Sequence, residues 1–203
     1  MSRNLKFFVF YSLALMFMCL CADAFAVPAE AQKGDWKYIV IHHSATETGN
    51  AAIFDKAHRR RGMRNGLAYH FVIDNGTSGR RDGQIETGSR WKRQIEGGHV
   101  RQRWLNIQGI GICIVGNLNE KCMTEKQYWS LVWLTKHLMK KYNIPQNKVL
   151  FHGKIKGEST ECPGKKFPYA RFQKDINISN NTDSKGKSSR KTKNSKNTRG
   201  TAK

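Results

Sequence analysis

An α/β domain, with one mixed β-sheet flanked by helices, is the fold class that the sequence predicts. Three short runs rich in β-branched residues have the pattern of buried strands: YIVIH at 38–42, IGICIVGN at 110–117 and KVLFHG at 148–153. Helical patterns separate these runs, and strands that alternate with helices favour a sheet covered by helices. The predicted domain spans residues 34–175, which is the length of one ordinary domain.

The longest predicted helix begins after Thr124 and extends to Tyr142. Threonine commonly caps helix N-termini, and the apolar residues that follow recur at helical spacing. Pro145 is expected to close this helix. The other predicted elements are a helix over 51–61 that Gly62 ends, strands over 68–74 and 84–88, and a helix over 168–176.

Residues 1–26 have the pattern of a secretory signal peptide. Arg3 and Lys6 precede an apolar run, and Ala24-Phe25-Ala26 fits the small-residue cleavage pattern. We therefore expect an exported protein, periplasmic or extracellular. A lipid anchor on one of the two cysteines in this segment is the weaker alternative, because neither lies in a good lipoprotein pattern.

The chain is strongly basic, with a formal net charge of +21 at pH 7. Residues 177–203 carry eight Lys and Arg against one Asp and have little apolar content, which predicts a disordered tail. Such a charge favours anionic partners, and for an exported protein these are envelope polymers. A tail that is merely solvated is the alternative. No stacking-aromatic motif indicates specific nucleic-acid binding, and we expect a monomer.

Three cysteines lie outside the predicted signal peptide, so at least one thiol stays outside any intramolecular bridge. Cys113 lies in an apolar strand pattern and is expected to be a small buried residue. Cys122 lies in a predicted loop, and a bridge between these two cysteines is left open. Cys162, in the sequence ECPG, needs another explanation.

Two histidines end the first predicted strand, and a third follows a later strand. His42 and His43 come after YIVI, His152 comes after VLF, and Cys162 follows ten residues later. Loops at neighbouring strand ends converge, and zinc prefers nitrogen and sulfur ligands, with three protein ligands in catalytic sites. The alternative is that the histidines are ordinary hydrogen-bonded residues at strand ends. The sequence contains no CxxC or HExxH motif that would favour the metal site over this alternative.

Five segments occur in an order that resembles a known family. They are YIVIHHSAT, AHRRRGMRNGLAYHFVI, GGHV, NIQGIGICIVGN and FHGKIKGESTECPG, and the similarity that they mark extends over roughly residues 37–172. They resemble the zinc-dependent N-acetylmuramoyl-L-alanine amidases of the type-2 family, which includes the phage lysozyme-type amidases and the peptidoglycan-recognition proteins. The resemblance implies hydrolysis of the amide bond between N-acetylmuramic acid and L-alanine in peptidoglycan or muropeptides. It implies Zn²⁺ as cofactor, with His42, His152 and Cys162 as its ligands.

The resemblance also assigns residues around the metal. Tyr69 matches a tyrosine whose hydroxyl points at the reacting groups, and Thr160 matches a position able to hydrogen-bond the developing oxyanion. His99 and Asn106 match positions that line the substrate cleft, although either could instead stabilise a loop. Cys113 occupies a position where one branch of the family has a catalytic Glu, so the sequence supplies no obvious carboxylate base.

The remaining histidines and a long loop have plainer interpretations. His43, His58 and His70 are expected to be structural, with an orienting role left open for His43. The loop over 74–91 contains cationic and aromatic side chains that could contact glycan or stem-peptide carboxylates or simply form an exposed charged loop: Arg80, Arg81, Arg90 and Trp91.

A non-catalytic peptidoglycan receptor on the same fold is the alternative function. Receptors of that kind lose a metal ligand, most often the cysteine. Because His42, His152, Cys162 and Tyr69 are all present, the enzyme is the favoured interpretation.

Overall fold

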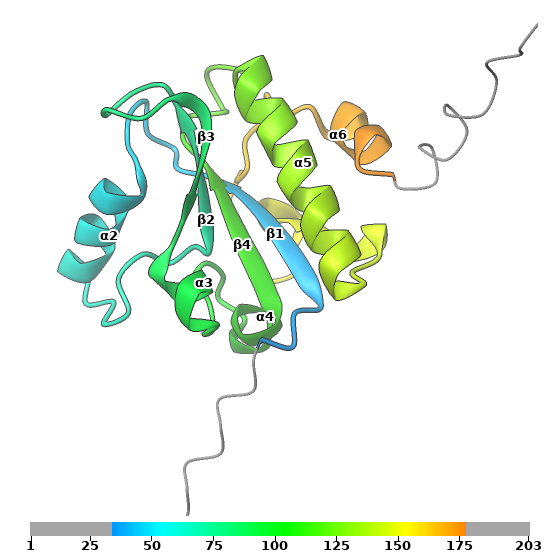
Figure 1. Ribbon diagram of the computed structural model, residues 1–203, viewed down its shortest axis with the longest axis horizontal. Helices are drawn as coiled ribbons and strands as arrows, with labels where there is room; N and C mark the ends of the chain where they lie inside the picture. The colour runs from blue at the N-terminus through cyan, green and yellow to red at the C-terminus, as the bar shows by residue number, and fades with distance from the viewer. Residues whose placement is uncertain (1–33, 178–203) are drawn as a thin grey trace, which may run out of the picture.

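A five-stranded sheet lies at the centre of residues 34–177, the part of the chain that this computed structural model describes (Figure 1). Its strands are β1 (Tyr38–His43), β2 (Phe71–Asn75), β3 (Asp82–Thr87), β4 (Gly109–Ile114) and β5 (Val149–Phe151), in the spatial order β3-β2-β4-β1-β5. β1 pairs in parallel with β4 and β5, β2 pairs in parallel with β4, and β3 is antiparallel to β2. The predicted mixed sheet flanked by helices is confirmed.

Within the described residues, α-helices surround this sheet. They are α2 (Ala51–Arg60), α3 (Ser89–Arg93), α4 (Arg103–Gln108), α5 (Glu125–Tyr142) and α6 (Tyr169–Asp175), with short 3₁₀ turns at Gln146–Lys148 and His152–Lys154. Helices α3 and α4 are additions to the elements that the sequence predicted. Between residues 34 and 177, no helix is both long and apolar enough to span a bilayer. The predicted signal peptide and residues 178–203 of the predicted tail lie outside the described residues.

The two faces of the sheet bury different apolar clusters. The larger cluster includes Ile39 and Ile41 of β1 and the inward side chains of α5, which lies across the sheet in Figure 1. The smaller one joins Val72 and Cys113 to Phe54 of α2. Because successive strand residues point to opposite faces, His42 lies on the face of the smaller cluster, where its register partner is Cys113.

Helix α5 begins as the sequence predicts. The Thr124 hydroxyl accepts from the N–H of Gln127, whose side chain accepts from the N–H of Thr124 in return, which is a complete capping box. The helix also ends at Tyr142 as predicted, but Asn143 and not Pro145 terminates it. Asn143, in the left-handed conformation with φ 53°, donates its N–H to the carbonyl of Met139 and terminates the helix before Pro145 is reached.

The loop around Arg90 corrects the expectation of an exposed charged segment. Arg90 lies on α3, is buried, and donates from Nε to the carbonyl of Leu67 and from a terminal nitrogen to the carbonyl of Glu96. Trp91 packs against the larger apolar cluster. The Arg90 guanidinium thus supplies donors for carbonyls that burial would otherwise leave without partners.

Candidate functional site

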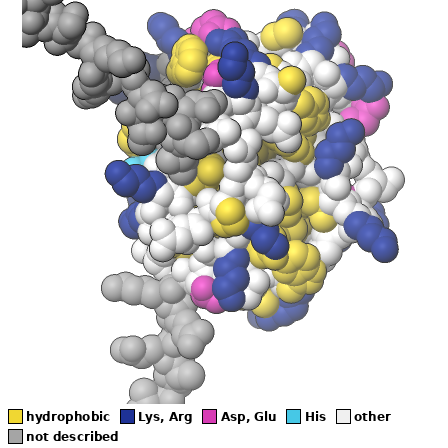
Figure 2. Space-filling view, turned by 90° about the vertical axis from the view of Figure 1, so that its right-hand side faces the viewer, with side chains coloured by type: hydrophobic (Ala, Val, Ile, Leu, Met, Phe, Trp, Pro, Cys, Tyr) yellow, Lys and Arg dark blue, Asp and Glu magenta, His cyan; other side chains and the backbone are white. Residues whose placement is uncertain are grey.

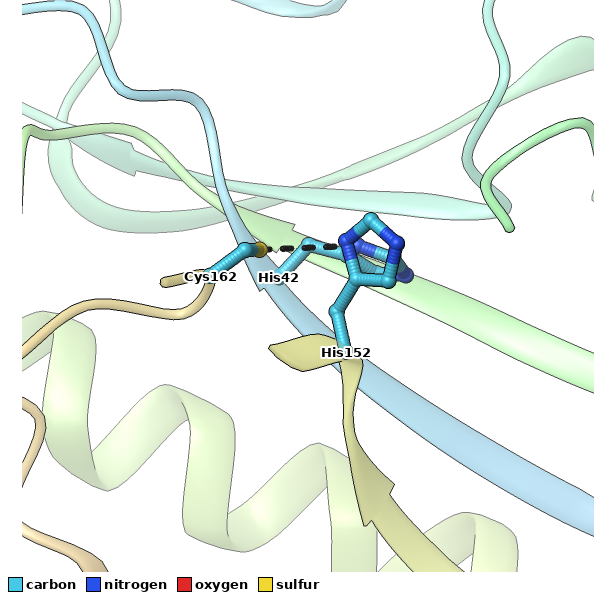
Figure 3. A group of neighbouring side chains, drawn as sticks. All are labelled: His42, His152 and Cys162. Carbon is cyan, nitrogen blue, oxygen red and sulfur yellow. Dashed lines mark hydrogen bonds between the residues drawn. The ribbon is translucent and has the colours of Figure 1, made fainter. Parts of the chain in front are cut away.

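His42, His152 and Cys162 come together at one end of the sheet. One ligand atom from each residue lies within 4.8 Å of the corresponding atoms of the other two (Figure 3). The Nδ1 atom of His42 lies 3.7 Å from the sulfur of Cys162. Nitrogen and sulfur ligands of a tetrahedral zinc ion lie about 3.6 Å apart, given bond lengths of about 2.1 and 2.3 Å. The spacing of this pair therefore fits a zinc ion.

The strand register explains why the two histidines meet. β1 and β5 are adjacent and parallel, and Ile41 of β1 lies opposite Phe151 of β5. The residue that follows each of these is a histidine, His42 on one strand and His152 after the other. The N–H of Gly153 then donates to the carbonyl of Cys162 at 2.5 Å and draws the cysteine loop back to this point.

Burial holds the nitrogen donors neutral. The pKa of His42 lies well below its usual value, mainly because the ring is buried and also because it adjoins His99. Burial also lowers the pKa of His152. A neutral imidazole has the lone pair that a metal ion requires, so both rings are in the form that binds a cation.

Two opposing effects act on the pKa of the Cys162 thiol. Burial raises the pKa of the Cys162 thiol to about 12, while the backbone N–H of His43, 3.3 Å from the sulfur, opposes that rise. A bound cation deprotonates a coordinating thiol, and the resulting thiolate would keep this N–H as a partner. The donor set of two neutral imidazoles and one thiol is the set that zinc prefers.

Tyr69 lies beside the trio. Its ring centroid is 5.2 Å from that of His42, and its hydroxyl interacts with the thiol of Cys113. The residue precedes β2 rather than lying within it, and the N–H of its neighbour Ala68 donates to the ring of His58 instead of to a strand. Burial holds the pKa of Tyr69 well above its usual value, so the hydroxyl stays protonated and able to donate.

Thr160 lies on the outer side of the cysteine loop. It is exposed, and its hydroxyl oxygen accepts from the N–H of Cys162 at 3.2 Å. With Gly153, Cys162 and Lys165 it lines a pocket of about 410 Å³, to which Cys162 is the contribution of the trio. A larger pocket of about 690 Å³ lies beside β5 and contains none of the predicted site residues.

His99 and Asn106 lie behind the trio instead of lining an open cleft. His99 is buried, with Nδ1 3.1 Å from Nε2 of His42 and Nε2 3.2 Å from the carbonyl of Gly109. The side-chain oxygen of Asn106 accepts from the N–H groups of His99 and Val100, and its amide donates to the carbonyl of Val100. These contacts favour supporting roles for both residues over contact with substrate.

Glu158 is a residue of the site that the sequence did not single out. Its Oε2 lies 3.1 Å from Nε2 of His152, and its side chain is only 4% exposed. Its other oxygen accepts from the N–H of Arg101 at 2.7 Å. The run GKIKGESTE has the composition of a solvated loop, so nothing in the sequence distinguished this glutamate from an exposed one.

Three further histidines, His43, His58 and His70, have structural partners. His43 accepts from the N–H of Leu118, and His58 accepts from that of Ala68. His70 accepts from the N–H of Gly111 and lies 3.1 Å from the carbonyl of Ile95.

The cysteines and the arginines of the long loop are also placed. The three cysteines of the described residues are all free, so no bridge joins Cys113 to Cys122. Arg80 pairs with Glu86 of β3 at 2.6 Å, and Arg81 is exposed.

Fold and site together define an α/β domain with a candidate three-ligand metal centre at the ends of two parallel strands. The family profile described as N-acetylmuramoyl-L-alanine amidase matches residues 32–165, and the chain belongs to that family. The endolysin N-acetylmuramoyl-L-alanine amidase LysCS from Clostridium intestinale URNW is 32% identical, with a TM-score of 0.61 over 71% of this chain and 85% of that one.

The second group of relatives consists of peptidoglycan-recognition proteins. Peptidoglycan-recognition protein SC2 of Drosophila simulans is 28% identical over 180 residues, which cover 75% of this chain and 90% of that protein. The structure of peptidoglycan recognition protein-LE in complex with tracheal cytotoxin, a monomeric diaminopimelic acid-type peptidoglycan, has a TM-score of 0.55. It is 24% identical, over 69% of this chain and 80% of that one, and so shows a shared fold.

Proposed function

We propose that the protein is a zinc-dependent amidase that hydrolyses the bond between N-acetylmuramic acid and L-alanine in peptidoglycan. The observation that carries this proposal is the convergence of His42, His152 and Cys162, spaced as zinc ligands are, in a chain of the amidase family. Two histidines and a cysteine leave one position of a tetrahedral ion for water or substrate, as in catalytic zinc sites.

Zinc at this position supplies Lewis acidity, which polarises a carbonyl oxygen and lowers the pKa of water toward about 7. Residues of the chain supply the hydrogen-bond donors for the developing oxyanion. Tyr69 keeps its proton and donates to the oxygen of the lactyl carbonyl as negative charge develops on it. Thr160 lines the adjacent pocket and can donate its O–H while its oxygen accepts from Cys162.

The family supports the proposed substrate and location. Peptidoglycan or its muropeptide fragments are the proposed substrates, as the amidase relatives and the recognition protein bound to a monomeric peptidoglycan support. We further propose that residues 1–26 direct export. Figure 2 shows many Lys and Arg side chains and few Asp and Glu on the face in view, which suits an anionic wall polymer.

A non-catalytic peptidoglycan receptor is the second candidate, because relatives of the recognition-protein group match this chain. The presence of Cys162 and Tyr69 beside His42 favours the enzyme. A receptor needs neither the sulfur ligand nor the hydroxyl of Tyr69.

Mass spectrometry of products from purified sacculi tests the proposal. The enzyme is expected to release free stem peptides that begin with L-alanine and to leave glycan with intact lactyl carboxylates. A chelator should stop this release, and added zinc should restore it. Binding to sacculi without release of any peptide would instead establish the receptor.

A further inference from the structure

The loop over residues 97–102, between α3 and α4, contacts the surroundings of both histidines of the trio. His99 reaches the far nitrogen of His42. Two residues later, the N–H of Arg101 holds Glu158, which lies 3.1 Å from the far nitrogen of His152. The side chain of Gln102 donates to the carbonyl of Lys156 at 2.7 Å and ties the same loop to the segment that carries Glu158.

The hydrogen bonds of His99 determine which nitrogen of His42 carries a proton. The carbonyl of Gly109 can only accept, so Nε2 of His99 must donate to it. With Nε2 donating to this carbonyl, the neutral ring of the buried His99 has an acceptor at Nδ1, which faces His42. His42 must then donate from Nε2, which leaves the lone pair on Nδ1, the atom 3.7 Å from the sulfur of Cys162.

Glu158 acts on His152 in the same sense. Nε2 of His152 has no well-aligned hydrogen-bond partner among the described residues, but the carboxylate charge of Glu158, 3.1 Å away, favours a proton on that nitrogen and a lone pair on Nδ1. Partners of this kind fix the tautomer and orientation of metal-binding histidines, and their loss typically weakens metal binding about 10- to 100-fold.

Two glycines leave the space that the ring of His99 occupies. A Cβ on Gly111 would lie 2.4 Å from the ring carbon Cδ2 of His99, and a Cβ on Gly97 would lie equally close to it. Asn106 holds the loop through three hydrogen bonds to the backbone of His99 and Val100. The carbonyl of Asn106 also accepts from the N–H of Gly97.

We propose that the loop over residues 97–102, anchored by Asn106, is a single brace that sets the tautomers of both histidine ligands. His99 and Glu158 are then positioning residues that act through His42 and His152. This inference rests on the proposed zinc site. It gives a role at that site to His99 of the GGHV segment and to Asn106.

Zinc affinity, measured by competition with a chromogenic chelator, tests the brace. His99→Phe fills the seat but neither donates nor accepts, and we expect its zinc affinity to fall at least about tenfold. His99→Asn places an oxygen where Nδ1 lies, so it should lose less than His99→Phe. A role in packing alone predicts the reverse order. The control is His58→Phe, a buried histidine that also accepts from a backbone N–H and should bind zinc normally.

Variants at Glu158 and Asn106 test the contacts that the loop over residues 97–102 makes with these two residues. Glu158→Gln should weaken zinc binding about tenfold, whereas Glu161→Gln, in the same segment but exposed and paired with Lys165, should not. Asn106→Ala, which removes the anchor of the loop, should weaken zinc binding as well. The absorption spectrum of the Co²⁺-substituted protein reports ligand geometry and should change in these variants.

The outcomes separate this inference from the proposed function. Wild-type protein that binds no zinc would overturn both. Tight zinc binding by the wild type together with unchanged affinity in folded His99→Phe and Glu158→Gln would overturn the brace alone. If His99→Phe does not fold, His99→Asn and Glu158→Gln carry the same test, and unchanged affinity and Co²⁺ spectrum in both would reject it.

Discussion

The ring of Tyr69 lies beside that of His42, with centroids 5.2 Å apart and planes tilted by 51°. The same tyrosine packs against the small apolar cluster over α2, and its hydroxyl interacts with the thiol of Cys113 on β4. Ring and hydroxyl are therefore separable by mutation, since the ring belongs to the packing and the hydroxyl can be removed without emptying the space that the ring fills.

Tyr69→Phe is expected to keep the fold and the zinc while slowing hydrolysis about a hundredfold, because one preorganised donor to the oxyanion is lost. Turnover of a soluble muropeptide and zinc content measure the two effects. Tyr38→Phe, which removes a hydroxyl near Lys148 instead, is the control. Turnover by Tyr69→Phe equal to wild type would mean that the hydroxyl has no part in the reaction.

Asp74 on β2 is expected to make the free energy of unfolding depend on pH. Burial, and after it the neighbouring Glu86, raises the pKa of Asp74 to about 7, although Arg80 opposes the rise. The unfolded chain loses this proton near about pH 4. Between these two pH values the native state therefore holds a proton that the unfolded state has released, and the free energy of unfolding falls as pH rises through this window.

Asp74→Asn should remove that loss, because the amide cannot ionise. The melting temperature of the variant should equal that of the wild type near about pH 4 and exceed it by a few degrees above about pH 7. Buried His70 and His99 destabilise both proteins alike at low pH, since their pKa values are lowered to about 4 and about 3. A difference that does not vary with pH would show that Asp74 has an ordinary pKa.

The predicted tail is expected to contribute to binding at surfaces and nothing to the site. Because Ile176 is buried in the larger cluster, the truncation that tests this belongs after Asn177 and not at the predicted boundary, residue 175. The truncated chain should hydrolyse small muropeptides at the full rate. On sacculi it should be slower at low salt and equal at high salt, because screening shortens the Debye length from about 10 Å at 0.1 M.

The rate ratio of full-length to truncated protein across a salt series measures this effect. A ratio that stays constant with salt would indicate specific contacts by the tail. Slower turnover of the small substrate by the truncated protein would mean that part of the tail belongs to the catalytic domain.

Much of the fold could be predicted because it depends on local patterns. The apolar runs at β1 and β4 and the capped, striped sequence of α5 determine these elements within a few residues. The helices α3 and α4 were missed because each is only one or two turns long and carries no capping side chain. Arg90 was misjudged because its burial depends on distant carbonyls of the chain, which no local pattern reveals.

The candidate site also has one part that could be predicted from the sequence and one part that could not. The grouping of His42, His152 and Cys162 could be expected from strand ends and resemblance. The places of His99 and Glu158 could not, because no local pattern shows that His99 lies behind His42 or that Glu158 is buried beside His152. Only the register of the sheet and the path of the loop over residues 97–102 distinguish them.

The central claim is that one zinc ion, held by His42, His152 and Cys162, is required for amide hydrolysis. The most direct measurement is the zinc content of the purified protein, by elemental analysis, beside its activity on a muropeptide, for the wild type and for His152→Ala. The account predicts about one zinc per wild-type chain, activity lost in chelator and regained with zinc, and little zinc or activity in the folded variant. Wild-type protein without zinc that hydrolyses the muropeptide at full rate in chelator would contradict it.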